Sequence, residues 1–538
     1  MPVLPTTFAE TGTHISDAYD AILPPPLSHS AIKLDSFALS GFFGGGRSVV
    51  GMAALKLIPG HRWCGWYNTP GSIEMAKQYG PLAHLKLLDA LFPEGEANPT
   101  RLFKLDVKKG PQFVAIHSTT TLKSTGHLAH LITRKAEETD LTYDHFPGRA
   151  TTSPSIAIVN LGHRGELGEP GKHPPLPRSW ETWFTFAPML VSVGACVMCA
   201  LVGDWFSFVS IVVGIVAHGV ACYAIGSGKL TLQHPEPAPK ARRGDGVLKG
   251  GKTLVVFVGD ERAVNVFTRG CFRLQYGAGA SDKKLNRFDD PLSAKNNIHA
   301  NIISPSSAKQ ASSVNHSVRN IHPSFNTKSP PRYLSRYIRR ICQPFLNPPQ
   351  SLIGYSALLL MGQFIIQLLL VPLGTLFGQL MFVATVIASW MYNAHLSSLN
   401  REGIQTRILM NAAELKDIDI RKYQLSTWTA TVAFACFVLA SEHPLDDPLH
   451  FLNAMVPKNT VAWKEWKRNM GEKLKDRRYF DLGANCKKIK FSKRDWEVAD
   501  GKNRGLLETL FHDAEDAWAA WSRVRHSPSL LKPGATWV

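Results

Sequence analysis

Two long apolar blocks, residues 181–227 and 351–396, constrain this chain more than any other feature of its sequence. Each block exceeds the roughly 20 apolar residues that one membrane-crossing helix needs. Each is also interrupted once, at Gly203-Asp204 in the first and at Pro372-Leu373-Gly374 in the second. The interruptions leave four runs without Asp, Glu, Lys or Arg, at 183–202, 205–225, 352–371 and 375–392. The sequence therefore predicts two transmembrane helical hairpins.

Basic residues flank these hairpins on one side only. The chain has 60 Lys and Arg against 42 Asp and Glu, a formal net charge of +18, yet neither hairpin connection contains a basic residue. Lys and Arg lie instead before the first and third runs and after the second and fourth. Because cytoplasmic loops are enriched in Lys and Arg, we predict an integral membrane protein with both termini and the central loop in the cytoplasm.

A fifth apolar run, TWTATVAFACFVLA at 427–440, is short for a membrane crossing. A crossing here would also separate the basic C-terminal segment from the other basic loops. We therefore expect a buried or interfacial helix, and a fifth crossing is the alternative.

The residues outside the two blocks form three regions that we expect to be cytosolic. Region 1–180 has the mixed patterns of an α/β domain, with helices at 81–92 and in LKSTGHLAHLITRKAEE and a strand hairpin formed by RLFKLDV and QFVAIHS. Region 228–350 is a basic loop with a short β segment and an Asn- and Ser-rich stretch, 282–332, for which we predict disorder. That stretch is either a natural insertion or a translated intron. Region 397–538 is predicted to be helical, so the fold class is an α-helical polytopic membrane protein with an α/β N-terminal region and a helical C-terminal region.

Two amphipathic helices are expected in the C-terminal region. The first is marked by Trp463, Trp466, Met470 and Leu474, and the second by Leu507, Leu510, Phe511, Ala514, Trp518 and Trp521. Because lysines surround the first tryptophan pair, we favour contact with lipid headgroups over stacking on RNA bases. The expected partners are therefore the lipid bilayer and either other proteins or further copies of this chain, and nucleic acid is not expected.

The segment GVLKGGKT at 246–253 satisfies the phosphate-loop pattern through Gly246, Gly251, Lys252 and Thr253. A working phosphate loop leaves a buried strand and opens a helix, whose N-terminus helps to bind the phosphates. Upstream of this match, HPEPAPKARRGDG contains three prolines and is incompatible with a central strand. Downstream, TLVVFVGDER is typical of a strand. We therefore interpret the glycines as a turn that enters a strand, and we expect no cofactor.

Two other motifs carry little chemical information. Cys196 and Cys199 have CxxC spacing, but they lie within a predicted span and no second pair completes a zinc site. His127 and His130 form an HxxH pair without a carboxylate or thiol close to them in the sequence. We assign no catalytic residue and no metal ligand.

Few polar residues interrupt the predicted spans. His218 is the one histidine within them, and Gln363, Gln367 and Gln379 are candidates for intramembrane polar contacts. The lack of charged residues argues against ion-coupled transport, and such glutamines more often bond between helices than line a pore. The sequence GTLFG at 374–378 offers small residues for close helix packing.

The stretches SVGACVMCALVGDWFSF, AIGSGKLTLQHPEPAP and LLVPLGTLFGQLMFVATVIASW resemble an uncharacterised family of multipass membrane proteins from mushroom-forming fungi. The resemblance covers the two hairpins and their flanks, and it implies a topology but no activity. We expect a non-enzymatic membrane protein that scaffolds or recruits partners. An oligomeric channel or facilitator is the alternative, and a nucleotide-binding enzyme that uses 246–253 comes third.

Overall fold

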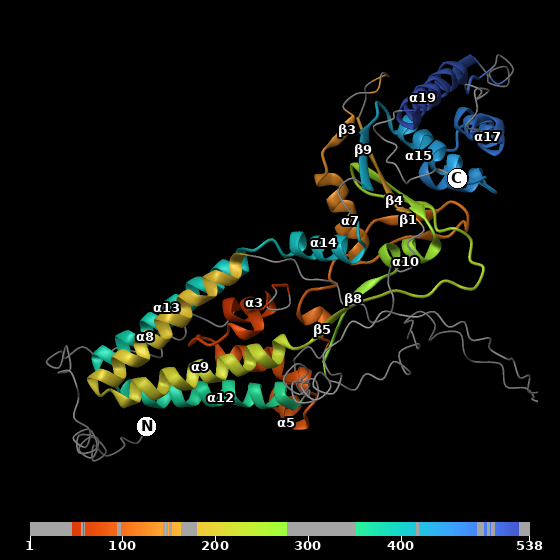
Figure 1. Cartoon of the computed structure of the whole chain (residues 1–538). Helices are drawn as coiled ribbons and strands as arrows, with labels where there is room; N and C mark the ends of the chain where they lie inside the picture. Colours follow the sequence, from red (N-terminus) through yellow and green to blue (C-terminus); the bar gives the residue numbers. More distant parts are fainter. Residues whose placement is uncertain are drawn as a thin grey trace, which may run out of the picture. The chain divides into compact units, whose positions relative to one another are not determined.

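In the computed structural model of the chain, the described residues are 46–54, 57–58, 60–93, 98–143, 146, 149, 153–162, 180–276, 351–415, 419–480, 489–491, 495 and 501–526. Those up to Gln275 and from Ser351 onward belong to one compact unit (Figure 1). The stretch 282–332, for which we predicted disorder, lies outside the described residues.

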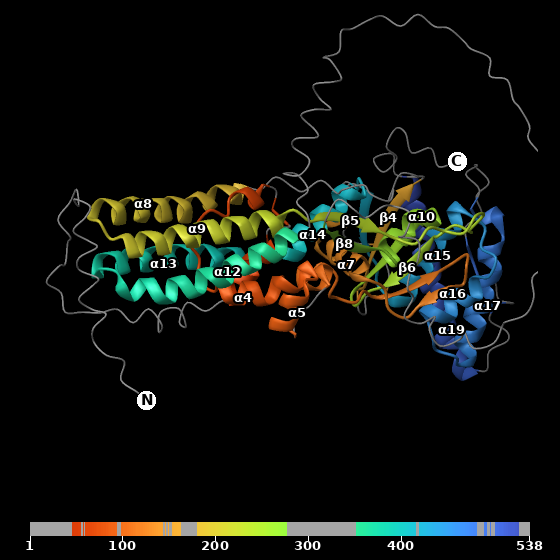
Figure 2. The same cartoon turned by 90° about the horizontal axis from the view of Figure 1, so that it is seen from below.

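Within the described residues, four helical segments are long and apolar enough to cross a membrane, which confirms the four runs as helical segments of spanning length. They contain α8 Phe186–Val202, α9 Trp205–Gly226, α12 Ser351–Leu370 and α13 Leu376–Ser398. The 3₁₀ helix η4 Trp180–Thr185 extends α8 at its start, and η6 Val371–Leu373 extends α12 at its end. Helix α9 packs on α12, and α8 packs on α13 (Figure 1 and Figure 2). Asp204 in the first hairpin turn is hydrogen-bonded to Thr375 in the second, so both turns lie at the same end of the four helices.

Several short N-terminal elements pack against these long helices. They are α3 Gly46–Ala54, η2 His61–Trp63, α4 Ser72–Tyr79 and η3 Gly80–Ala83. Helix α3 contacts α13, α4 contacts α12, and η2 contacts α9. The single helix predicted over 81–92 is wrong, because His84 adopts φ +50° and separates η3 from α5 Lys86–Leu91.

The sheet has seven strands in the order β2-β1-β6-β7-β4-β9-β3. The bounds are β1 Gln112–Ala115, β2 Thr121–Leu122, β3 Leu141–Tyr143, β4 Ser155–Gly162, β6 Gly246–Lys249, β7 Thr253–Gly259 and β9 Ile420–Gln424. Strands β4 and β7 are parallel, whereas β6 is antiparallel to both β1 and β7. The sheet therefore joins strands from all three regions that lie outside the apolar blocks.

Two expectations about strands fail in this sheet. RLFKLDV is not a strand, because Asn98 caps Thr100 N and Pro99 occupies the first turn, which starts the short helix α6 Pro99–Leu102. QFVAIHS does supply β1, but its partners are β2 and β6. The C-terminal region is not wholly helical either, since β9 pairs with β4.

A separate two-stranded sheet joins β5 Lys229–Gln233 to β8 Cys271–Gln275.

Helices cover both faces of the seven-stranded sheet. Because side chains alternate along a strand, Leu254 and Val256 of β7 face the core under α15 Trp428–Glu442, while Phe257 stacks on Phe267 of α10 on the other face. The remaining helices of the two layers are α16 Pro448–Met455, α17 Val461–Lys475 and α19 Gly501–His526 beside α15, and α7 His127–Glu138 beside α10 Glu261–Thr268. The helix predicted in LKSTGHLAHLITRKAEE is thus confirmed as α7.

Helix α15 settles the assignment of the fifth apolar run. All residues from Thr429 to Ala440 are buried, against the sheet on one side and α17 and α19 on the others. Its 15 residues span about 22 Å, which is shorter than the roughly 30 Å hydrocarbon core of a bilayer. The buried helix is confirmed, and the fifth crossing is wrong.

The tryptophan pair of α17 belongs to the same core. Trp466 is 0% exposed and its Nε1 donates a hydrogen bond to Leu510 O at 3.0 Å, while Trp463 is 8% exposed. The amphipathic helix is confirmed, but headgroup or RNA contact through these rings is wrong, because both rings pack inside the protein. The apolar face predicted for the second helix is buried along α19, so the two helices face each other.

Candidate functional site

The inserted segment, which we define as residues 60–71, runs along α9 between the long helices. Figure 1 shows the adjoining α3 between the pair α8 and α13 and the pair α9 and α12. A Cβ atom at Gly226 would collide with Arg62, and one at Gly214 would collide with Asn68 Oδ1. Gly214 is twelve residues from Gly226, or about 18 Å along the helix, which exceeds half of a hydrocarbon core of about 30 Å. The tip of the inserted segment thus lies near the middle of the long helices.

Asn68 forms the centre of a buried polar network at this tip. Its backbone N donates to Ser192 Oγ of α8 at 3.1 Å, and its Nδ2 donates to Thr385 Oγ1 of α13 at 2.8 Å. Its Oδ1 accepts from Gln367 Nε2 of α12 at 2.9 Å, and the same nitrogen also donates to Ser210 O of α9 at 3.1 Å. Asn68 is 0% exposed, and its side chain and backbone N bond directly to α12, α13 and α8, while Gln367 extends the network to α9.

The four polar residues predicted within the spans are divided between two places. Gln363 Nε2 donates to Thr69 O at 3.2 Å, and His218 Nδ1 donates to Gly65 O at 2.7 Å. With Gln367, both therefore contact the inserted segment. Gln379 lies apart, because its Nε2 donates to Val371 O and Gly374 O near the second hairpin turn.

Irregular backbone is tolerated at membrane depth where its polar groups are satisfied inside the protein. Beyond the bonds above, Pro70 O accepts from Ser48 Oγ at 2.8 Å, and Thr69 Oγ1 accepts from Asn393 Nδ2 at 3.2 Å. Gln363 Oε1 is buried without a hydrogen-bond partner in the part of the chain that the structure describes. Of the buried side-chain atoms in this network, only this oxygen lacks a partner among the described residues.

A second polar centre joins the two hairpin turns. Asp204 is 3% exposed, and its Oδ2 accepts from Thr375 N at 2.8 Å and from Thr375 Oγ1 at 2.7 Å. Its carboxylate also caps α9 through Ser207 N at 3.1 Å. A Cβ at Gly374 or Gly378 would collide with Ser207 Oγ, so these glycines permit the close approach of the second hairpin to the first. The GTLFG segment thus packs one hairpin against the other.

The phosphate-loop match covers β6, the turn after it and the first residue of β7, which is antiparallel to β6. Gly246 begins β6, Thr253 begins β7, and Gly251 and Lys252 lie in the connection between them. Thr253 is 2% exposed and its Oγ1 is 2.7 Å from Ser155 Oγ, in the adjoining strand β4. No helix follows Thr253, because the chain continues as β7, as the pattern downstream predicts. The segment therefore lacks the strand-to-helix geometry of a phosphate loop.

The other motifs have structural partners. Six cysteines lie in the described residues, and none of the six forms a disulfide. His127 Nε2 is 2.9 Å from Gln405 Oε1, and His130 Nε2 is 3.6 Å from Glu402. Glu402 is thus a carboxylate close to the HxxH pair, which the sequence spacing did not reveal, but it also forms ion pairs with Lys108 and Arg134. Among the described residues, no group of three or more His, Cys, Asp or Glu could hold a metal ion.

A cluster of ionisable side chains lies at one edge of the sheet, outside the long helices. Asp245, just before β6, is fully buried, and its Oδ1 accepts from Gly259 N at 2.6 Å. Its Oδ2 accepts from Arg243 Nε at 3.1 Å and is 3.2 Å from His117 Nε2. The ring of His443, at the end of α15, lies 6.4 Å from the His117 ring.

The charges of this cluster depend on each other. Burial pushes the pKa of Asp245 upward, but the hydrogen bonds from His117 and Gly259 outweigh it, so the pKa is lowered overall. Burial, and then the neighbouring Asp245 charge, raise the pKa of Glu442 to about 7. Burial, and then Arg243, lower the pKa of His443. Glu442 therefore changes its charge near neutral pH.

The chain matches no protein-family model, no curated protein and no solved structure. The resemblance to the fungal multipass proteins stays a prediction, and function is argued from the geometry alone. Sequence patterns missed three central residues, Asn68, Asp204 and Asp245, because each lies in an irregular segment without a motif. For Asp204 a signal existed, since it is an acid that directly precedes an apolar run, as a helix cap does.

Proposed function

We propose that this chain is an integral membrane protein whose long helices anchor a non-enzymatic module that scaffolds or recruits partner proteins. The module consists of the seven-stranded sheet with its helical layers. Three regions separated by the apolar blocks contribute strands to it, so the module forms only when both hairpins are in place. This supports a membrane-bound function over that of a releasable soluble domain.

The observation that carries the proposal is the network around Asn68. Polar side chains from the long helices turn inward and bond to the inserted segment, which fills the space between the helices. A pathway for ions or small solutes needs polar groups that face water, whereas Asn68, Thr69 and Gln363 are each at most 1% exposed. The intramembrane polar groups therefore serve assembly.

The proposed orientation places the module in the cytoplasm. Both hairpin turns lie at one end of the long helices, so the segments that lead to the module leave from the other end. The Lys and Arg residues next to the hairpins lie on the segments at that other end, in agreement with the positive-inside rule.

The testing experiment is native mass analysis of the protein after gentle extraction from its own membranes. We expect a complex with other proteins in fixed stoichiometry that survives purification. A discrete homo-oligomer without other proteins would contradict recruitment.

The alternative is an oligomeric channel or facilitator. It is favoured by one observation, the open acceptor Gln363 Oε1 near the middle of the long helices. Solute flux through proteoliposomes tests it: if Gln363→Leu, which removes this acceptor, changes the flux while Leu369→Gln on the exposed face leaves it unchanged, the channel replaces the scaffold. Leu369 is a matched control because it lies on the same helix and is 62% exposed.

A further inference from the structure

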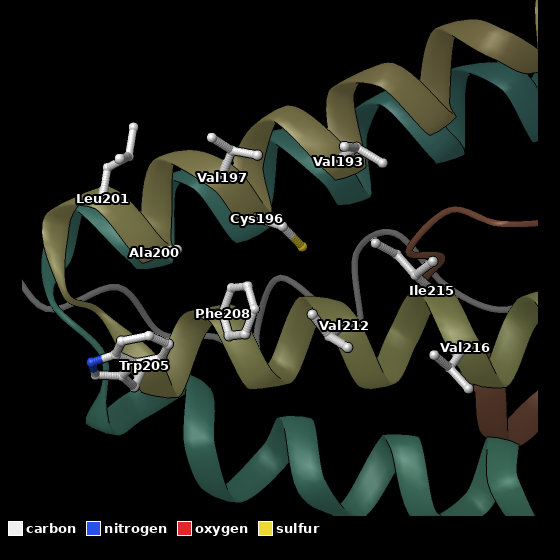
Figure 3. A pocket seen from close by; sticks show the side chains of 10 residues that line it. All are labelled: Val193, Cys196, Val197, Ala200, Leu201, Trp205, Phe208, Val212, Ile215 and Val216. Atoms are coloured by element: carbon white, nitrogen blue, oxygen red, sulfur yellow. The ribbon is translucent and has the colours of Figure 1, made fainter.

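An apolar groove of about 670 Å³ runs between α8 and α9 (Figure 3). Its outer walls are exposed, with Val197 at 51% and Val216 at 44%, whereas Cys196 in its floor is only 8% exposed. Phe208 and Val212 also line the groove and pack against the buried cluster that contains Cys196. No Asp, Glu, Lys, Arg or His side chain is among the lining residues.

The groove occupies one half of the long helices. On α8 it extends from Val193 to Leu201, about 12 Å, and on α9 from Trp205 to Val216, about 16 Å. One leaflet of a hydrocarbon core of about 30 Å has a depth of about 15 Å. The inner end lies beside Ser192, which bonds to the tip of the inserted segment, and the outer end lies at the hairpin turn.

The size of the groove decides between two kinds of occupant. A volume of about 670 Å³ over a length of about 14 Å gives a mean cross-section of about 50 Å². An α-helix with its side chains has a diameter of about 10 Å and a cross-section of about 80 Å². A helix of a second copy is therefore too wide to lie within the groove and could only pack across its mouth, while an extended hydrocarbon chain fits inside.

The surroundings of the groove identify the source of such a chain. The groove opens onto a surface of exposed apolar side chains, including Leu190 at 71%, which faces lipid if the helices cross a bilayer. Trp205 at the outer end is 43% exposed, and tryptophan is enriched at the boundary between lipid and water. The groove is thus continuous with the lipid-facing surface.

We propose that the groove between α8 and α9 binds one acyl chain of a membrane lipid from the leaflet at the hairpin turns. The proposal rests on the membrane insertion proposed above. The bound chain fills the space between α8 and α9 in one leaflet, as the inserted segment fills it in the other.

The experiment uses the full chain in phosphatidylcholine vesicles that contain a lipid with a photoreactive diazirine on one acyl chain. Crosslinked peptides are mapped by mass spectrometry. We expect labelling to concentrate on 193–201 and 205–216. Ala200→Phe, which adds a ring inside the groove, should lower that yield about tenfold, equivalent to about 1.4 kcal/mol of binding. Leu190→Trp, on the same helix but outside the groove, should leave it unchanged.

Three results would overturn the proposal. Labelling of the groove at the same yield as the exposed face around Leu369 would show ordinary bilayer contact only, and so would a yield that Ala200→Phe does not change. A crosslink to a second copy that Ala200→Phe abolishes would assign the groove to self-association. If Ala200→Phe alters the elution volume of the protein, Val212→Trp replaces it. Absence of lipid labelling on all four helices would instead refute membrane insertion and with it the proposed function.

Discussion

Asp204→Asn exchanges one carboxylate oxygen for an amide nitrogen at the point where the two hairpin turns meet. Oδ2 of Asp204 accepts from Thr375 N at 2.8 Å, Thr375 Oγ1 at 2.7 Å and Ser207 Oγ at 3.0 Å. An amide nitrogen there could not accept from Thr375 N, and each hydroxyl would have to accept where it now donates. If the amide turns its oxygen toward Thr375, the cap on Ser207 N is lost instead. The carboxylate also lies at the positive N-terminal ends of α9 and α13.

The magnitude follows from these contacts. A hydrogen bond to a charged group contributes about 1.5 to 3 kcal/mol, and at 3% exposure water does not replace the lost bonds. Because bonds that share one carboxylate are not additive, we expect a loss of about 3 kcal/mol for Asp204→Asn. For a protein of this size, that corresponds to a fall in Tm of roughly 3 °C.

The assay is thermal unfolding in mild detergent, followed by the fraction that elutes as a monodisperse peak. Asp447→Asn is the matched control, because Asp447 caps α16 through His450 N at 3.3 Å but is exposed, and Asn caps a helix as well as Asp does. We expect the control to stay within about 0.5 kcal/mol of the wild type. Equal Tm values for the two variants would refute the reasoning that the Asp204 carboxylate joins the hairpins.

Three further predictions concern the bundle and the sheet edge. Asn68→Leu should lower the Tm by an amount comparable to Asp204→Asn, because it removes the buried hydrogen bonds to Thr385 of α13 and Gln367 of α12; an unchanged Tm would contradict the network. Gly378→Ala should destabilise the protein in the same assay by about 1 to 3 kcal/mol, since its Cβ would collide with Asp204. Gly362→Ala is the control and should be neutral or stabilising, because no atom lies within 4 Å of the added Cβ. A larger loss of stability for Gly362→Ala than for Gly378→Ala would refute the packing argument. The folded-state pKa of Glu442 is about 7, above its ordinary value, so protonated Glu442 contributes favourably to the free energy of unfolding. This contribution is complete only below about pH 4.3, and it is lost as the pH rises through 7. Glu442→Gln should therefore raise the free energy of unfolding by about 1 kcal/mol at pH 8 and by less at pH 5, measured by denaturant titration, and a gain that is the same at both pH values would contradict the pKa shift.

Patterns within a few turns of the chain predicted part of this structure well. The four long helices, α7, α17, α19 and the entry of Thr253 into a strand follow from the spacing of apolar residues and from local composition. The same patterns did not distinguish a surface helix from a buried one. The lysines around Trp463 and Trp466 indicated lipid headgroups, but both rings are buried, and Trp466 bonds to Leu510 of α19. Amphipathicity shows that a face is buried and does not show against what.

The amino-acid sequence was sufficient to predict the number, approximate length and uncharged character of the long helices, because an apolar run of about 20 residues without charges satisfies its backbone in lipid only as a helix. It also predicted that the glycines before Thr253 form a turn that enters a strand, although β6 at Gly246–Lys249 was not foreseen. The tertiary structure alone decided that three separate regions build one sheet and that residues 60–71 enter the bundle. The physical reason is distance along the chain: Asn68 and Thr385 are 317 residues apart, and neither lies in a pattern that shows it has a partner. Such a contact is required because polar groups that are buried without a partner are costly. The burial that creates this requirement arises only when the helices pack together.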